Sequence, residues 1–90
     1  MRFEWDPSRA AHNKRKHDVS FEEAAECFAD PLALVLDEPD YPDRLILIGE
    51  SPRRRLIFTV YVERATATIR IISARKATRT ERRRYEEGAD

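Results

Sequence analysis

The sequence has few residues that form covalent or metal cross-links, with one cysteine, Cys27, and two histidines. A single cysteine excludes an internal disulfide and a zinc site built from several cysteines. Only two glycines are present, which excludes a glycine-rich phosphate-binding loop. No spacing of His, Asp and Glu residues is typical of a metal site, so we expect neither a metal nor a cofactor.

Long apolar runs are also absent. No stretch approaches the roughly 18 residues that a transmembrane helix needs, and the start of the chain lacks the pattern of a signal peptide. We therefore expect a cytoplasmic protein that does not contact a membrane. The 90 residues are expected to form one domain, residues 1–90, because a chain of this length buries enough surface for one core.

Charge is balanced in total but segregated along the chain. The 17 basic and 17 acidic residues cancel. Residues 18–43 carry nine acidic and no basic groups, whereas residues 44–85 carry twelve basic and three acidic groups. A basic surface attracts an anionic partner even on a neutral protein, and the alternative is that both charged surfaces are merely solvated.

Local patterns predict three helices and five strands. Helix start signals occur at Asp6-Pro7 and in the capping boxes Ser20–Glu23 and Thr78–Glu81. The expected helices are 7–17, 21–29 and 78–87, and the expected strands are 1–5, 32–36, 44–49, 56–62 and 68–73. Short links between the last four strands favour antiparallel hairpins. The fold class is therefore α+β: a short N-terminal strand, two helices, a mainly antiparallel sheet of four to five strands, and a short basic C-terminal helix.

The second and last helices differ in apolar content. In the second, Phe21, Ala24 and Phe28 share a packed face with Cys27 in an apolar stretch, while Glu23 is expected to lie outside the packed face. In the last, Tyr85 is the only large apolar residue. That helix must either dock lightly on the domain or be held by a partner.

Five motifs occur in order along the chain: F-x-W-D at Phe3–Asp6, Asn13 followed by Lys16-His17, V-S-F-E-E-A at Val19–Ala24, I-I-S-A-R at Ile71–Arg75, and A-T-R-x-E-R-x-x-Y at Ala77–Tyr85. Together they resemble the motifs of the BrnT toxins of bacterial type II toxin–antitoxin modules. The resemblance spans Phe3 to Gly88. The chain departs from it at Arg9, where many members have Lys, and at Asp18, where many have Gly.

The resemblance implies a fold similar to RelE-type ribonucleases and an activity that arrests growth by cleaving RNA. It also implies a BrnA-like antitoxin with a ribbon-helix-helix DNA-binding domain. Promoter DNA is then an indirect partner, bound through the toxin–antitoxin complex.

Metal-free RNA cleavage needs a proton acceptor, a proton donor and a cation that stabilises the phosphorane. The candidate catalytic residues are Arg75, Arg82, Glu81 and His17. Arg75 is expected just past the last strand, where its planar fork suits a phosphate. Simpler readings remain open, because Glu81 also caps a helix and His17 complements a helix dipole.

The candidate RNA-binding residues are Lys16, Arg70, Arg79, Arg83 and Tyr85. Tyr85 either stacks on a base or anchors the last helix, and the anchor is the favoured reading. The loop arginines 53–55 are expected to contact phosphate loosely or to be solvated.

Two functions follow. The favoured one is a metal-independent endoribonuclease toxin that a cognate antitoxin neutralises. The alternative is a non-catalytic module that binds nucleic acid or protein through the basic C-terminal surface.

Overall fold

The structure of the protein, a computed structural model, describes residues 1–65 and 67–88. Its elements are β1 (Arg2–Glu4), α1 (Pro7–His17), α2 (Phe21–Glu26), the 3-10 helix η1 (Cys27–Ala29), β2 (Leu34–Asp37), β3 (Leu45–Glu50), β4 (Leu56–Arg64), β5 (Thr68–Lys76) and α3 (Arg79–Glu87). The predicted α+β class is confirmed. Residues 66, 89 and 90 of the predicted domain 1–90 lie outside the described residues. No described helix is long and apolar enough to cross a membrane.

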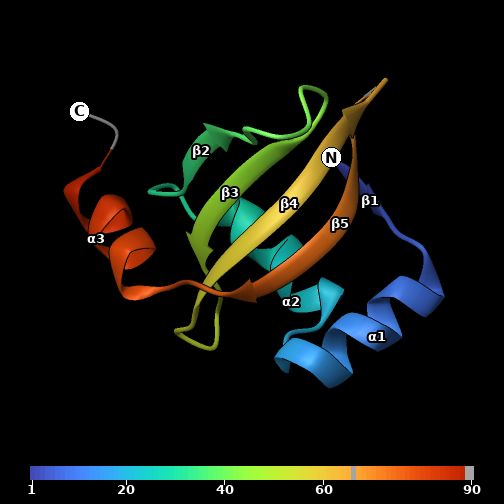
Figure 1. The fold of residues 1–90 in the computed structure, drawn as a ribbon, viewed down its shortest axis with the longest axis horizontal. Coiled ribbons are helices and arrows are strands. Elements are labelled where there is room, and N and C mark those ends of the chain that lie inside the picture. Colours follow the sequence, from blue (N-terminus) through green and yellow to red (C-terminus); the bar gives the residue numbers. More distant parts are fainter. Residues whose placement is uncertain (66, 89–90) are drawn as a thin grey trace.

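The five strands form one sheet in the order β1-β5-β4-β3-β2. The neighbours from β2 to β5 are antiparallel, as the short links between them predict. The first strand, β1, adds to the edge of β5 in parallel. Figure 1 shows the sheet face on, with α2 behind β3 and β4, and with α3 to one side of β2 and β3.

One face of the sheet is covered by the first two helices. The core on this face joins Phe21 and Ala24 of α2 to buried residues of the strands, including Ile57 and Ile71. At Gly49 of β3, an added Cβ would lie 2.9 Å from the carbonyl oxygen of Cys27. Glycine at this position therefore allows η1 to pack directly against the sheet.

The helix ends follow the local signals. The side chain of Asp6 accepts a hydrogen bond from Ser8 N, and that of Ser20 accepts one from Glu23 N. Asp18, where many BrnT sequences have glycine, adopts the left-handed conformation with φ 59°. Its side chain accepts a hydrogen bond from Lys14 at 3.2 Å, and Asp is one of the few residues that tolerate this conformation.

Several boundaries differ from the prediction, and two of the differences matter for the site. The helix expected over 21–29 is α-helical only to Glu26 and then tightens into the 3-10 turn η1. The last strand continues to Lys76 instead of stopping at Ser73, because pairing with β4 extends to Ile57. Arg75 was therefore predicted wrongly to follow the strand, and it lies within β5.

The last helix, α3, docks on the opposite face of the sheet. Tyr85 and Ala77 pack against a second apolar cluster that contains Leu34, Ile46, Ile48 and Leu56. The Tyr85 hydroxyl donates a 2.6 Å hydrogen bond to Asp30 Oδ2. No residue of α3 is fully buried, and Tyr85 is one of its two partly buried residues, with Glu81.

We expect Tyr85→Phe to loosen α3 without unfolding the domain. The change removes the hydrogen bond to Asp30, a net contribution of about 1–2 kcal/mol to the docking of α3. Amide hydrogen exchange should therefore quicken in α3 and stay unchanged in β4. The control Tyr41→Phe deletes a hydroxyl from a half-exposed ring outside α3 and should change neither. Equal exchange of α3 in the wild type and Tyr85→Phe would show that the hydrogen bond does not hold this helix.

Candidate active site

A β-bulge decides which way Arg75 points. Val60 of β4 pairs with Ser73, but the next residue, Tyr61, pairs with Ile71, so Ile72 is an extra residue in β5. Strict alternation from Ile71 would place Arg75 on the covered face. The bulge reverses the alternation, so Ala74 is buried under the helices and Arg75 faces the other side.

On that side, residues of β4 and β5 form a surface that we call the open sheet face. It consists of Phe58, Val60, Val62, Arg70, Ser73 and Arg75, which are paired across the two strands. All six side chains are partly exposed. In Figure 1 no helix lies in front of β4 and β5 among the described residues. This surface combines an aromatic ring, apolar side chains and two cations.

Arg75 is held from two directions. Its guanidinium lies 4.0 Å from the centre of the Phe58 ring, a cation–π contact. Its Nη1 and Nη2 donate to Glu81 Oε1 and Oε2 at 2.8 and 2.9 Å. About 36% of the Arg75 side chain remains exposed. A planar cation in this position is oriented and accessible at the same time.

The pair keeps both of its charges near neutral pH. Hydrogen bonds from Arg75 hold the pKa of Glu81 below its usual value, and hydrogen bonding to Glu81 raises the pKa of Arg75. Glu81 is therefore an ionised acceptor and not a proton donor. It also accepts a hydrogen bond from Thr78 N in the predicted capping box, so one carboxylate connects Arg75 to the start of α3.

The arginines of α3 lie near the Arg75–Glu81 pair but form no ion pair with Glu81 among the described residues. Glu81 and Tyr85 lie one turn apart and face the sheet, which places Arg79 and Arg83 on the outer side of the helix. Arg82 flanks Tyr85. The side chains of Arg79, Arg82 and Arg83 are exposed and form no ion pair among the described residues. They are available to an anionic partner.

Arg70 lies on the same face, at the far end of β5. It lies five positions before Arg75, roughly 16 Å away along an extended strand at ~3.3 Å per residue. It pairs with Glu4 of β1 at 3.2 Å. The two cations of the open sheet face are thus too far apart to bind one phosphate group.

His17 and Lys16 come from a different element than Arg75. They end α1, which packs through Ala10 into the core on the covered face. His17 is partly buried and Lys16 is exposed. Among the described residues, no hydrogen bond or ion pair links either side chain to Arg75 or Glu81.

Sequence patterns missed a buried ionic group beside the domain core. Glu23, expected outside the packed face, is only 3% exposed and was predicted wrongly. It accepts hydrogen bonds from Arg55 Nε at 2.9 Å and from Ser51 Oγ at 2.7 Å, and Arg55 Nη2 also pairs with it. Arg55 was therefore wrongly placed among the solvated loop arginines, because the loop before β4 folds back over α2.

A second missed residue is Asn13, whose side chain is buried between α1 and β5. The motif that joins Asn13 to Lys16 and His17 marked the residue but gave it no role. In the structure its side-chain amide forms hydrogen bonds with the backbone N–H and C=O of Ala74.

The buried thiol and the metal-binding residue types offer no second site among the described residues. Burial raises the pKa of Cys27 to about 12, so its thiol is a poor nucleophile at neutral pH. The described residues contain no group of three His, Cys, Asp or Glu side chains arranged to hold a metal ion.

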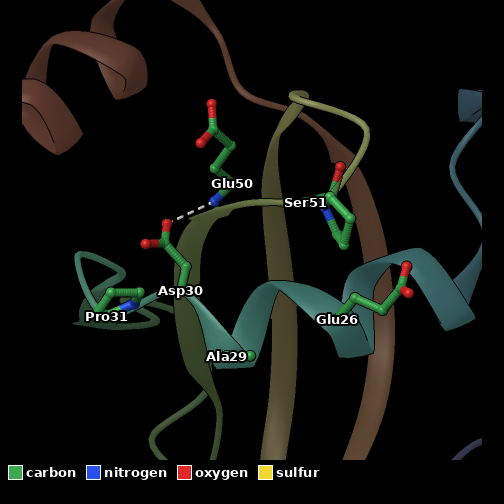
Figure 2. Close-up of a pocket in the computed structure, with 7 residues that line it drawn as sticks. Glu26, Ala29, Asp30, Pro31, Glu50 and Ser51 are labelled. Carbon is green, nitrogen blue, oxygen red and sulfur yellow. Dashed lines mark hydrogen bonds between the residues drawn. The ribbon is translucent and has the colours of Figure 1, made fainter.

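A shallow pocket of about 260 Å³ lies between η1 and the end of β3, and Arg75 does not line it. Figure 2 shows its carboxylates, with Asp30 accepting a 2.8 Å hydrogen bond from the backbone N–H of Glu50. The lining residues are Glu26, Ala29, Asp30, Pro31, Glu50, Ser51 and Pro52. Three carboxylates and no basic side chain make this pocket unsuitable for a phosphate.

Comparison with known proteins points to the same family as the five sequence motifs. The sequence profile of the family described as "Ribonuclease toxin, BrnT, of type II toxin-antitoxin system" matches residues 5–81. The crystal structure of the Brucella abortus ribonuclease toxin BrnT, at 1.1 Å resolution, superposes with a TM-score of 0.72 at 25% identity. The superposition covers 88% of this chain and 99% of that one. No curated protein matches the sequence.

The profile match includes Arg75 and Glu81 but ends before Arg82, Arg83 and Tyr85. It spans most of the chain, and the fold agrees with that of the Brucella toxin over nearly its full length. The chain therefore belongs to the BrnT family of ribonuclease toxins of type II toxin–antitoxin systems.

Proposed function

We propose that this toxin is a metal-independent endoribonuclease and that Arg75 stabilises the reacting phosphate. The 2′-hydroxyl oxygen attacks the adjacent phosphorus, and the bond to the 5′ oxygen breaks. A base takes the 2′ proton and an acid protonates the leaving oxygen. The observation that carries the proposal is the oriented, partly exposed guanidinium of Arg75 on the open sheet face.

Arg75 suits this role because it is permanently charged and held in place before substrate arrives. Its contacts with Phe58 and Glu81 restrict the orientation of its fork. A preorganised cation gains more in the transition state than a mobile one, since no reorganisation is needed when charge develops on the phosphorane.

Glu81 and His17 are our candidates for proton transfer. Glu81 is ionised beside Arg75, so it can accept the 2′ proton, although the hydrogen bonds that lower its pKa also make it a weaker base. His17 would have to reach the same phosphate from the end of α1. Arg82 beside Tyr85 is proposed to add positive charge near the leaving group.

RNA binding extends beyond the reacting phosphate in this proposal. Arg79 and Arg83 on the outer side of α3 would contact flanking phosphates, and Lys16 and Arg70 would do so from α1 and β5. Tyr85 is already packed against the sheet and bonded to Asp30, which supports the anchoring role over base stacking.

The partner we propose is a BrnA-like ribbon-helix-helix antitoxin, in the cytoplasm. An acidic segment of the antitoxin that binds across the open sheet face would neutralise the cations of this face and would also cover Arg75. Promoter DNA would then be bound by the antitoxin part of the complex.

The test is RNA cleavage by the free 90-residue chain in the presence of EDTA, with the chemistry of the new 3′ ends determined. We expect cyclic-phosphate or 3′-phosphate ends, because a 2′-hydroxyl attack leaves the phosphate on the 3′ side. An Arg75→Ala control, purified in parallel, should produce no such ends and so exclude a contaminating nuclease.

Two results would contradict the proposal. Cleavage that EDTA abolishes would show a metal-dependent reaction. Salt-dependent RNA binding without cleavage, weakened step by step as the α3 arginines are removed, would instead support the non-catalytic binding module.

A further inference from the structure

The edge of β5 changes its partner just before Arg75. Strand β1 pairs with β5 only as far as Arg70. Beyond that point β5 has β4 on one side and, among the residues that the structure describes, no strand on the other, because β1 leads into α1. The backbone N–H and C=O of Ala74 would be left without a strand partner on this edge.

The side chain of Asn13 takes the place of that strand. Its Nδ2 donates to Ala74 O at 2.8 Å, and its Oδ1 accepts from Ala74 N at 3.1 Å. These are the two hydrogen bonds that a neighbouring strand would form with one residue. Asn13 is 5% exposed, so water cannot replace it readily.

The same amide also holds the junction of the two N-terminal helices. The second hydrogen on Nδ2 donates to Val19 O at 3.0 Å. Both N–H donors of the Asn13 amide and its oxygen acceptor are therefore hydrogen-bonded. One side chain thus connects α1, the link to α2, and the residue that precedes Arg75. Val19 is fully buried, so the link is part of the rigid core.

We propose that Asn13 is a positioning residue for Arg75, acting by completing the edge of β5 where β1 ends. The proposal rests on the catalytic role proposed above for Arg75. The Arg75 fork must meet both Phe58 and Glu81, and both contacts depend on the direction of the β5 backbone at residue 74. A misplacement of about 1 Å can cost roughly 100-fold in rate.

The variant that separates positioning from general stability is Asn13→Asp. It keeps the size of the side chain but sets a carboxylate against the carbonyl oxygens of Ala74 and Val19. Asn13→Ala serves as a second variant that introduces no charge. The control is Leu47→Ala, which damages the same core from β3, where Leu47 is 5% exposed and does not contact Arg75.

The first measurement is the Arg75 Nε–Hε resonance in ¹⁵N-arginine-labelled protein, assigned by its loss in Arg75→Lys. The ring of Phe58 should displace this resonance from those of exposed arginines. We expect Asn13→Asp and Asn13→Ala to move it toward the exposed positions, and Leu47→Ala to leave it in place. An unmoved resonance in both Asn13 variants would overturn the proposal, as would an equal shift in Leu47→Ala.

The second measurement is RNA cleavage under conditions in which every variant is folded. We expect kcat to fall about 100-fold in Asn13→Asp with KM changed less than about threefold, and kcat to stay near wild type in Leu47→Ala. If the wild type cleaves no RNA while the resonance shifts as expected, the proposed activity fails and the positioning of Arg75 by Asn13 stands.

Discussion

An Arg75→Lys variant should cleave RNA about 100- to 1,000-fold more slowly than the wild type, although the positive charge is kept. Lysine cannot form two parallel hydrogen bonds, and its ammonium does not stack as a plane on the Phe58 ring. The expected loss of rate equals the loss measured when one preorganised hydrogen-bond donor is removed from a site that stabilises a transition state. The measurement is single-turnover cleavage of a defined RNA.

The matched control is Arg70→Lys. Arg70 lies on the same strand and the same face, but it pairs with Glu4 at the other end of β5. We expect its cleavage rate to change less than about threefold at saturating RNA, because only a peripheral phosphate contact is altered. Equal losses in the two variants would mean that Arg75 contributes general charge and not a specific fork.

Glu23→Ala should lower the free energy of unfolding by about 3–5 kcal/mol, because removing one partner of a buried ion pair leaves the other uncompensated. Glu23 is the buried acceptor for Arg55 and Ser51. The exposed neighbour Glu22 supplies the control, and Glu22→Ala should cost less than about 1 kcal/mol. Urea unfolding at pH 7 compares the two variants.

The carboxyl group of Glu23 also predicts how the stability of the wild-type protein depends on pH. Hydrogen bonding from Arg55 lowers the pKa of Glu23 from 4.5 to about 2. A lowered pKa in the folded state stabilises the protein above pH 4.5, and this contribution is lost as the pH falls from 4.5 toward 2. The loss should reach about 3 kcal/mol and should be absent in Glu23→Ala. A parallel decline in both proteins would show that other carboxylates cause the acid sensitivity.

Local sequence patterns were sufficient for the starts of the helices, the order of the elements and the family. The Ser20 and Thr78 caps lie where the capping boxes predicted, and Gly88 ends α3. Such signals depend on residues three or four positions apart, so they are complete within a short segment. The five motifs also identified the BrnT family, which the profile match confirms.

The tertiary structure alone decided what the side chains of Asn13 and Glu23 meet. Asn13 bonds a residue 61 positions away, and Glu23 bonds Arg55 across 32 positions. Neither pairing follows from local periodicity, which placed Glu23 outside the packed face of its helix.

The orientation of Arg75 is the clearest example. Period-two alternation continued from Ile71 would point it into the core, and one extra residue at the bulge turns it toward Phe58 and Glu81. A bulge forms through pairing with another strand, so its position depends on the register between β4 and β5 and is not contained in the pattern of either strand.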